Sequence, residues 1–185
     1  NTAPPNLYWI GGSGKWNDGL HWSLTSGGPA VNCIPNSFTN VFFDASSFST
    51  AGQVVTVNVP VAYCRNMNWT GAIQPIFVDS VADVILKIYG SLILSNQVTM
   101  DYDGVVHFEA NSNGQTILMA TRAFTNDAVF NGSGSWMLVD EFKSKKILLN
   151  RGTLNTNNQH VEAEAFISAD DHTRLLILGN SVVDL

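Results

Sequence analysis

Residues 8–23 read YWIGGSGKWNDGLHWS. Three of the five tryptophans of the chain, Trp9, Trp16 and Trp22, lie in this stretch, and four glycines separate them. Each glycine destabilises a helix by about 1 kcal/mol relative to alanine, so the tryptophans do not form one face of a helix. The stretch instead predicts short extended pieces that end in tight turns built from glycine and Asx residues.

The remainder of the chain continues this pattern over its 185 residues. No window holds apolar residues at helical spacing, and short β-prone runs alternate with Gly, Asn, Ser and Asp residues that favour turns. The predicted strands cover residues 41–43, 54–59, 84–88, 91–94, 105–108, 116–119, 128–130, 136–139, 147–149, 160–166, 175–178 and 182–185. The sequence is therefore predicted to be all-β.

A degenerate repeat in the second half favours one all-β architecture over another. The residues Phe108, Phe130, Leu149 and Phe166 each lead into a turn and a further apolar strand, at a spacing that shortens slightly along the chain. Repeats of about 20 residues are typical of solenoids, in which each coil buries its apolar face on its neighbours. A β-sandwich is the alternative, but a two-residue hairpin turn is found only near Asp103 and Gly104.

We therefore predict a right-handed parallel β-helix with a tryptophan-rich N-terminal cap. Residues 1–50 are expected to form this capping segment, and residues 51–185 the coils of one continuous domain, a fragment of a larger protein. The side chains expected to stack inside the solenoid are those of Phe108, Ile117, Phe130, Leu138, Leu149, Leu154, Phe166 and Leu176.

The composition limits the partners of the chain. Apolar residues make up 45% and charged residues only 13%, and the formal net charge is −6. The basic residues do not cluster beyond Lys143, Lys145 and Lys146, so a nucleic-acid footprint is not predicted. No apolar run approaches the roughly 18 residues that a membrane span requires.

Two cysteines, Cys33 and Cys64, allow two interpretations. They could be free buried thiols, or they could form a disulfide that closes a loop of about 32 residues and adds roughly 3–4 kcal/mol of stability. Few lysines and many Asn and Thr residues favour an extracellular, oxidising environment and hence the disulfide.

The residues that could carry chemistry are scattered. Glu162 and Glu164 would share one strand face, the spacing of a general acid/base pair, but a solvated outer face is the preferred interpretation. None of the four histidines has another His or Cys two to five residues away, and the acid pairs are scattered over different predicted coils, so we predict no metal, no cofactor and no enzymatic activity. The cluster Trp9, Trp16 and Trp22 could stack on sugar rings, or it could plug the open end of the solenoid, which we favour.

The opening stretch also carries a family resemblance. It resembles the pattern W-x-G-G-x-G-x-W-x-x-x-x-x-W-S of β-helical surface modules in large secreted bacterial proteins. The matching residues are Trp9, Gly11, Gly12, Gly14, Trp16, Trp22 and Ser23. Residues 35–44 are similar to the segment that follows in those modules, with Asn40 in place of the usual acid. Residues 89–92, 129–136, 151–156 and 174–181 look like parts of the same modules.

Such modules are common in adhesin-like proteins of gliding bacteria that are exported through the type IX system. The resemblance implies a secreted or cell-surface adhesin module that presents a binding surface to a glycan or protein ligand. A carbohydrate-binding module, or a β-helix similar to polysaccharide lyases and hydrolases, is the alternative. A purely structural stalk segment is a third interpretation.

Overall fold

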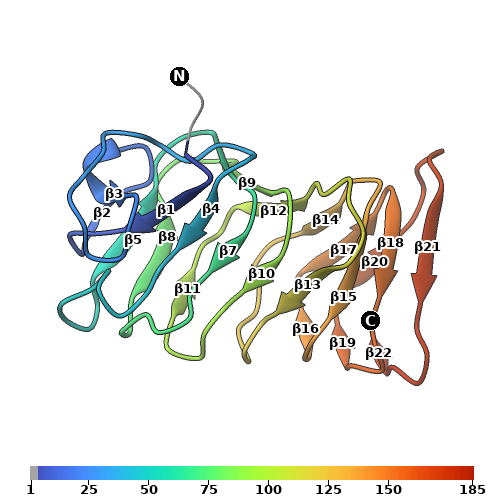
Figure 1. Ribbon diagram of the computed structural model, residues 1–185. Coiled ribbons are helices and arrows are strands. Elements are labelled where there is room, and N and C mark those ends of the chain that lie inside the picture. The colour runs from blue at the N-terminus through green and yellow to red at the C-terminus, as the bar shows by residue number, and fades with distance from the viewer. Residues whose placement is uncertain (1–3) are drawn as a thin grey trace.

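The computed structural model describes residues 4–185, and strands dominate this range (Figure 1). Its single helix is the 3-10 turn η1 (Gly19–His21). Within the described residues every pair of neighbouring strands is parallel except β1 (Asn6–Trp9) with β3 (Trp22–Ser23), which is antiparallel. The chain is a parallel β-solenoid of about seven coils, as predicted, and not a β-sandwich.

A nine-stranded sheet forms one side of the solenoid along its whole length. It begins with β3 and β1 and continues in chain order. Its other strands are β4 (Asn40–Phe42), β7 (Met67–Asn68), β10 (Leu92–Ile93), β13 (Gln115–Leu118), β15 (Ser135–Leu138), β18 (Gly152–Asn155) and β21 (Arg174–Ile177). Because β1 and β4 already belong to this sheet, part of the segment 1–50 builds the first coil as well as the cap.

A six-stranded sheet forms a second side. Its strands are β6 (Val61–Cys64), β9 (Ile85–Ile88), β12 (Val105–Phe108), β14 (Ala128–Phe130), β17 (Lys146–Leu149) and β20 (Ala165–Ile167).

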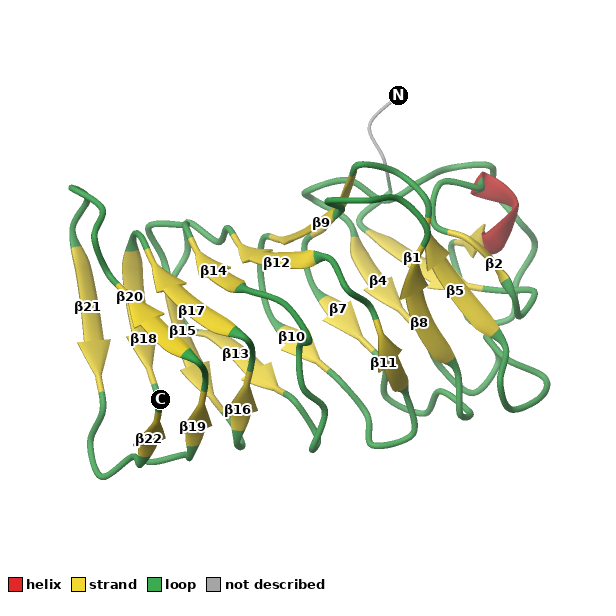
Figure 2. Cartoon of the chain, turned by 180° about the vertical axis from the view of Figure 1, so that it is seen from behind, coloured by secondary structure: helices red, strands yellow, loops and turns green. Residues whose placement is uncertain are grey.

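The third side is split into a four-stranded and a three-stranded sheet. The first contains β2 (Gly14–Lys15), β5 (Val54–Val57), β8 (Ile76–Asp79) and β11 (Thr99–Asp101), and the second β16 (Phe142–Lys143), β19 (Val161–Glu162) and β22 (Val183–Asp184). They cover the N-terminal and C-terminal halves of the solenoid respectively (Figure 2).

The split falls in the coil of β13 and β14, which has no strand on this side. Ala120 and Thr121, in the turn that leads to this side, have φ angles of 50° and 66°, in the left-handed region. The carboxylate of Asp140 holds this turn, since it accepts from the amides of Met119 and Ala120 at 2.7 and 2.6 Å.

The coils shorten along the solenoid. In the first half Val41 pairs with Met67, and Met67 pairs with Leu92. In the second half Trp136 pairs with Leu154, so much less chain separates the two partners there. The shorter coils lie in the half that carries the three-stranded sheet.

The core is one continuous stack of apolar side chains from alternate strand positions. Phe108, Phe130 and Leu149 lie in register, as the repeat predicted. Ile117, Leu138 and Leu154 are also buried. Phe166 pairs with Ile147, two residues away from the predicted register, and is only partly buried, as is Leu176 in the last coil.

Tryptophan rings close the N-terminal end of this core. Trp9, Trp16 and Trp22 are at most 2% exposed. The Trp9 and Trp22 rings meet edge to face at 5.0 Å, and their indole N–H groups donate to the carbonyl oxygens of Gly12 and Trp16. The antiparallel strand β3 covers the free edge of β1. The three rings are therefore covered and leave no open face for a sugar.

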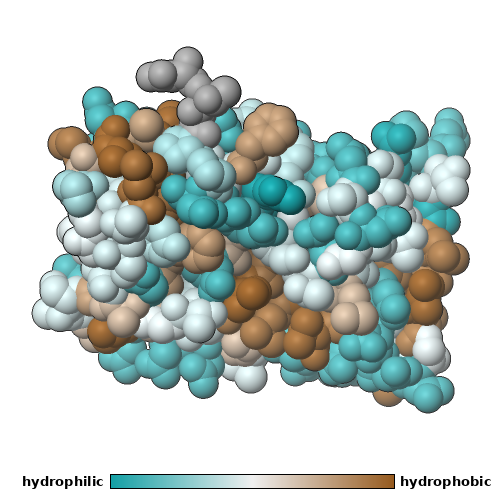
Figure 3. Space-filling model, in the orientation of Figure 1, coloured by the Kyte–Doolittle hydropathy of each residue, from teal (hydrophilic) through white to brown (hydrophobic). Residues whose placement is uncertain are grey.

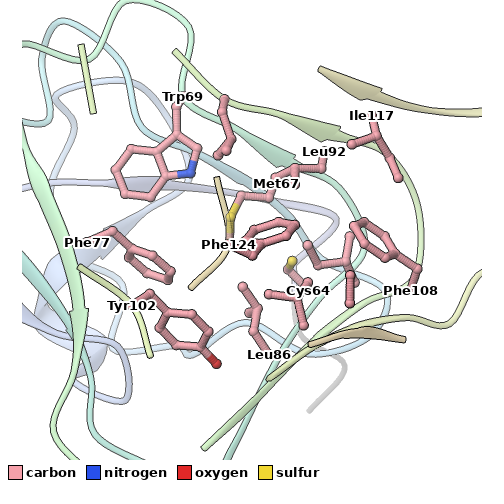
Figure 4. Close-up of a cluster of buried hydrophobic side chains, with 14 of the residues drawn as sticks. Cys64, Met67, Trp69, Phe77, Leu86, Leu92, Tyr102, Phe108, Ile117 and Phe124 are labelled. Carbon is pink, nitrogen blue, oxygen red and sulfur yellow. The ribbon is translucent and has the colours of Figure 1, made fainter. Parts of the chain in front are cut away.

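The prediction of a Cys33–Cys64 disulfide is wrong: both cysteines are free thiols. Cys64 ends β6 and lies in register with Ile88, so its side chain points into the core among Leu86, Met67 and Phe124 (Figure 4). Cys33 is partly exposed in the loop between β3 and β4. Burial raises the pKa of the Cys64 thiol, which keeps it neutral. The position of Cys64 makes it a core residue.

Candidate functional site

The outer face of the six-stranded sheet carries a cluster of charged and polar side chains. Its centre is Glu109, directly after β12. One carboxylate oxygen lies 3.0 Å from the Lys87 ammonium and 3.3 Å from Nδ1 of His107, and the other accepts from the Asn131 amide at 3.2 Å. We call Lys87, Tyr89, His107, Glu109 and Asn131 the Glu109 cluster.

The parallel register assembles this cluster from three successive coils. Tyr63, Lys87 and His107 occupy equivalent outward positions of β6, β9 and β12. The inward residues Ile88, Phe108 and Phe130 also pair with one another, so the residues that follow them, Tyr89, Glu109 and Asn131, form a second outward row. The cluster is thus fixed by backbone pairing over three coils.

Electrostatics hold Glu109 and Lys87 in their ionised forms at neutral pH. The pKa of Glu109 is lowered to about 2, first by the hydrogen bond with His107 and then by the hydrogen bond and charge of Lys87 and by Asn131. The hydrogen bond with Glu109 raises the pKa of Lys87. A carboxylate and an ammonium with pKa values this far from 7 are not poised to exchange protons near neutrality.

The arrangement is suited to binding. Side-chain donors and acceptors lie beside two tyrosines, and Tyr63 is 39% exposed. Burial raises the pKa of Tyr89, which keeps its hydroxyl protonated and able to donate. A rigid sheet face with aromatic rings and fixed polar groups can present hydrogen bonds to a glycan or a protein surface.

A second polar region lies along the three-stranded sheet. A groove of about 670 Å³ is lined by residues that include Phe124, Lys143, Glu162, Glu164 and Asp184. Lys143, Glu162 and Asp184 form one outward column, and the Lys143 ammonium lies 2.5 Å from the Glu162 carboxylate.

Both nitrogens of His160 contact carboxylates at the rim of this groove. Nδ1 lies 2.6 Å from Glu141 and Nε2 lies 2.8 Å from Asp184. These two hydrogen bonds, that of Asp184 first, raise the pKa of His160. The bridge joins three consecutive coils.

The acid pair considered from the sequence and two other carboxylates fall into different settings. Glu162 and Glu164 both line the groove, but Glu162 is ion-paired with Lys143, and Glu164 lies exposed beyond β19. Asp140 binds backbone amides of a turn, and Asp103 accepts from the hydroxyl of Thr125 at 2.9 Å. Among residues 4–185 no group of three or more His, Cys, Asp and Glu side chains is arranged to hold a metal ion.

The Glu109 cluster was not predicted from the sequence, although the spacing of Glu109 and Asn131 points to it. Asn131 follows Glu109 by 22 residues, whereas Lys87 is in register with His107, 20 residues further along the chain. The interval between Glu109 and Asn131 equals the Phe108–Phe130 repeat from which the solenoid was predicted. Polar residues repeated at the coil length are expected to meet on the outer face.

No helix in the described part of the chain is long and apolar enough to cross a membrane. Comparison of the sequence with protein-family models and with curated proteins, and of the structure with solved structures, finds no significant match.

Proposed function

We propose that this chain is a non-enzymatic β-solenoid module of a bacterial cell-surface adhesin. In this proposal it is secreted or cell-surface-bound and belongs to a larger protein of the gliding-motility, type IX secretion class. The outer face of the six-stranded sheet is its binding surface, and an extracellular glycan or protein is its ligand. The observation that carries the proposal is the Glu109 cluster, a polar surface that backbone register fixes across three coils.

Two further observations support a role in display. Asparagine side chains also bond from coil to coil on the nine-stranded sheet. The amide of Asn40 donates to Asn6 at 2.8 Å, and that of Asn66 donates to Asn40 at 2.7 Å. The second support is the resemblance of residues 8–23 to modules of surface adhesins. A scaffold stiffened by its core and by such ladders presents a ligand surface with little entropy loss on binding.

The alternative function is polysaccharide binding or cleavage in the groove of the three-stranded sheet. The groove favours it by bringing the carboxylates of Glu162 and Glu164 to one surface. The Lys143 ion pair counts against it, since the Lys143 ammonium already occupies a Glu162 carboxylate oxygen that an acid/base pair would have to offer to a substrate.

Binding to an array of bacterial and plant glycans and to immobilised extracellular proteins tests the proposal. We expect Lys87→Ala to weaken the strongest binding signal by about tenfold, the typical effect of losing one charged hydrogen bond. Lys15→Ala is the matched control, because Lys15 is an exposed strand lysine on a different sheet. Equal binding by both variants, or the absence of any binding, would refute this surface.

The alternative needs its own assay. The chain is incubated with pectin, alginate and xylan, and released reducing or unsaturated ends are measured. Turnover that disappears in Glu162→Gln and persists in Lys87→Ala would replace the adhesin proposal with the enzyme.

A further inference from the structure

The last coil exposes apolar side chains that earlier coils bury. Ile147, Leu154 and Val161 are at most 2% exposed, whereas their register partners Phe166, Leu176 and Val183 are only partly buried. The exposed fractions of Leu178 and Leu185 are 39% and 71%. The apolar surface at the C-terminal end is visible at the right edge of Figure 3.

These side chains surround a hollow that leads into the core. The cavity is about 200 Å³, and all its lining residues except Thr156 are apolar. They include Leu154, Phe166, Leu176, Val183 and Leu185. An apolar cavity of this kind gains free energy when further apolar side chains fill it.

The backbone edges at this end are also free. The strands β20, β21 and β22 are each the outermost strand of their sheets. The carbonyl oxygens of Thr173 and Ile177 accept from the amides of Gly152 and Thr156 in the preceding coil, so these two residues of β21 and its turn face β18. Alternate residues of a strand face opposite neighbours, so the amides of Arg174 and Leu176 lie on the unpaired side of β21. Natural sheets protect free edges with Pro or Lys residues. None of these three strands contains Pro or Lys, and their only charges are Arg174 at the start of β21 and Asp184 at the end of β22.

A turn next to β21 repeats the coil-to-coil contact that an added coil would need. The side chain of Asn158 accepts from the backbone amide of Asn180 at 2.8 Å. Asn180 follows Asn158 by 22 residues, the same step that separates Leu154 from Leu176, and its side chain is exposed. The side chain of Asn180 is therefore placed to accept from a backbone amide of an added coil, as the side chain of Asn158 accepts from the amide of Asn180.

We propose that the C-terminal end is a docking surface for one further β-coil that stacks on it in parallel. The partner is an extended polypeptide with apolar side chains at alternate positions, above Phe166, Leu176 and Val183. Its backbone extends the edges of β20, β21 and β22. The proposal rests on the proposed role as a solenoid module, and it does not depend on the Glu109 cluster.

The geometry favours a parallel coil over a second copy of the chain. Head-to-tail stacking of copies would bring this end against the N-terminal end, where β3 and the tryptophan cap already cover the core. Two copies joined tail to tail would run antiparallel, which breaks the parallel register that aligns the inward rows.

A tandem copy of residues 164–185 appended after Leu185 tests the surface. The appended segment keeps the step that separates Leu154 from Leu176, so its copies of Phe166, Leu176 and Val183 are placed above the originals. The matched control carries serine at those three copied positions. Amide hydrogen exchange and thermal unfolding are measured for both extended chains and for the chain without an extension.

We expect the apolar extension to slow exchange of the Leu176 amide by about tenfold or more, because the amide gains a strand partner. We expect it to raise the Tm by about 5 °C, and the serine control to do neither. Equal exchange in the two extended chains would overturn the proposal. A shorter extension, copying residues 164–169 alone, tests the edge of β20 by the same measurement if the longer one misfolds.

Sedimentation of the chain without an extension tests whether a second copy of the chain, and not an added coil, occupies this end. A stable dimer that Leu178→Lys dissolves would assign this end to a second copy and overturn the proposal. Neither this result nor the exchange result depends on ligand binding at the Glu109 cluster, so each proposal fails separately.

Discussion

The two ends of the solenoid finish the same nine-stranded sheet in different ways. At the N-terminal end, β3 turns back antiparallel on β1, and three buried tryptophans close the core. At the C-terminal end, β21 has a free edge, and the side chains beneath it are partly exposed. The difference lies in the sequence of the terminal coils. Residues 8–23 contain glycines and tryptophans that allow a tight return, whereas residues 174–185 continue the coil pattern.

The two halves also pack differently. Aromatic rings pack in the core of both halves, most closely in the longer N-terminal coils, where the centroids of Phe43 and Trp69 are 3.7 Å apart, against 4.8 Å for Phe108 and Phe130. In the shorter C-terminal coils, glycine turns of neighbouring coils nest on one another. A Cβ atom at Gly152 would lie 2.4 Å from the carbonyl oxygen of Gly132. The comparison predicts that the two halves respond to different substitutions.

The largest effect is expected at the sealed end. Trp9→Ala removes a fully buried ring and its hydrogen bond to Gly12, and should lower the free energy of unfolding by about 3–5 kcal/mol. Leu176→Ala at the open end should cost less than about 2 kcal/mol, because Leu176 is already partly exposed. Denaturant unfolding of the two variants measures the difference. Equal losses would contradict the distinction between a sealed and an open end.

The next effect concerns the glycine turns. A Cβ at Gly132 would lie 2.1 Å from the carbonyl oxygen of Ala110, so Gly132→Ala forces neighbouring coils apart and should cost about 3 kcal/mol. Gly114→Ala is the matched control. Gly114 has a φ of 82° but open space around it, so its substitution should cost only about 1 kcal/mol. Thermal unfolding compares them, and a greater loss in Gly114→Ala would show that backbone conformation outweighs coil contact.

The sequence predicted the C-terminal half better than the N-terminal half. Regular spacing of Phe108, Phe130 and Leu149 located in-register strands, because the coils between them are short and their turns are rich in Gly and Asn. In the first half, the strands β6 and β8 directly follow Pro60 and Pro75 and were not predicted. The coils there are longer, and their extended loops obscure the repeat.

Other features depend on register, which local pattern does not determine. The disulfide was inferred from composition, but the inward position of Cys64 decides its environment. Phe166 was assigned to the wrong inward row because the spacing of apolar residues placed it after Leu149, whereas strand pairing places it opposite Ile147. The Glu109 cluster arises from three coils, so it becomes visible only once the strands are aligned.

A smaller effect is expected from the titration of Glu109. Its pKa is lowered to about 2 in the folded chain, from an ordinary value near 4.5. A lowered carboxyl pKa stabilises the fold above the unfolded-state value, and this contribution is lost as the pH falls from about 4.5 towards 2. The difference between the two pKa values corresponds to a contribution of at most about 3 kcal/mol to the free energy of unfolding.

The measurement is the free energy of unfolding between pH 5 and pH 2 in the native chain and in Glu109→Gln. The native chain should lose more stability than the variant over this range, because the glutamine does not titrate. Glu164→Gln is the control for the loss of one carboxylate, since Glu164 is exposed and lies outside the Glu109 cluster. Parallel curves for Glu109→Gln and the native chain would contradict the assignment.

The smallest effect is expected at the rim of the open end, where it changes a titration and not the fold. Hydrogen bonds with Asp184 and Glu141 raise the pKa of His160 above its ordinary value near 6.5. Asp184 lies on β22, the last strand of its sheet, so Asp184→Asn removes a charge from the exposed edge. NMR titration of the His160 ring should therefore give a lower pKa in Asp184→Asn than in the native chain. Asp18→Asn, at the sealed end, should leave the His160 pKa unchanged.

Because His160 and both its partners are at the surface, 1 M salt should also reduce the difference in His160 pKa between the native chain and Asp184→Asn. A His160 pKa that is insensitive to both changes would show that the bridge does not form in solution, and that β19 and β22 are held at the open end by backbone pairing and apolar contact alone.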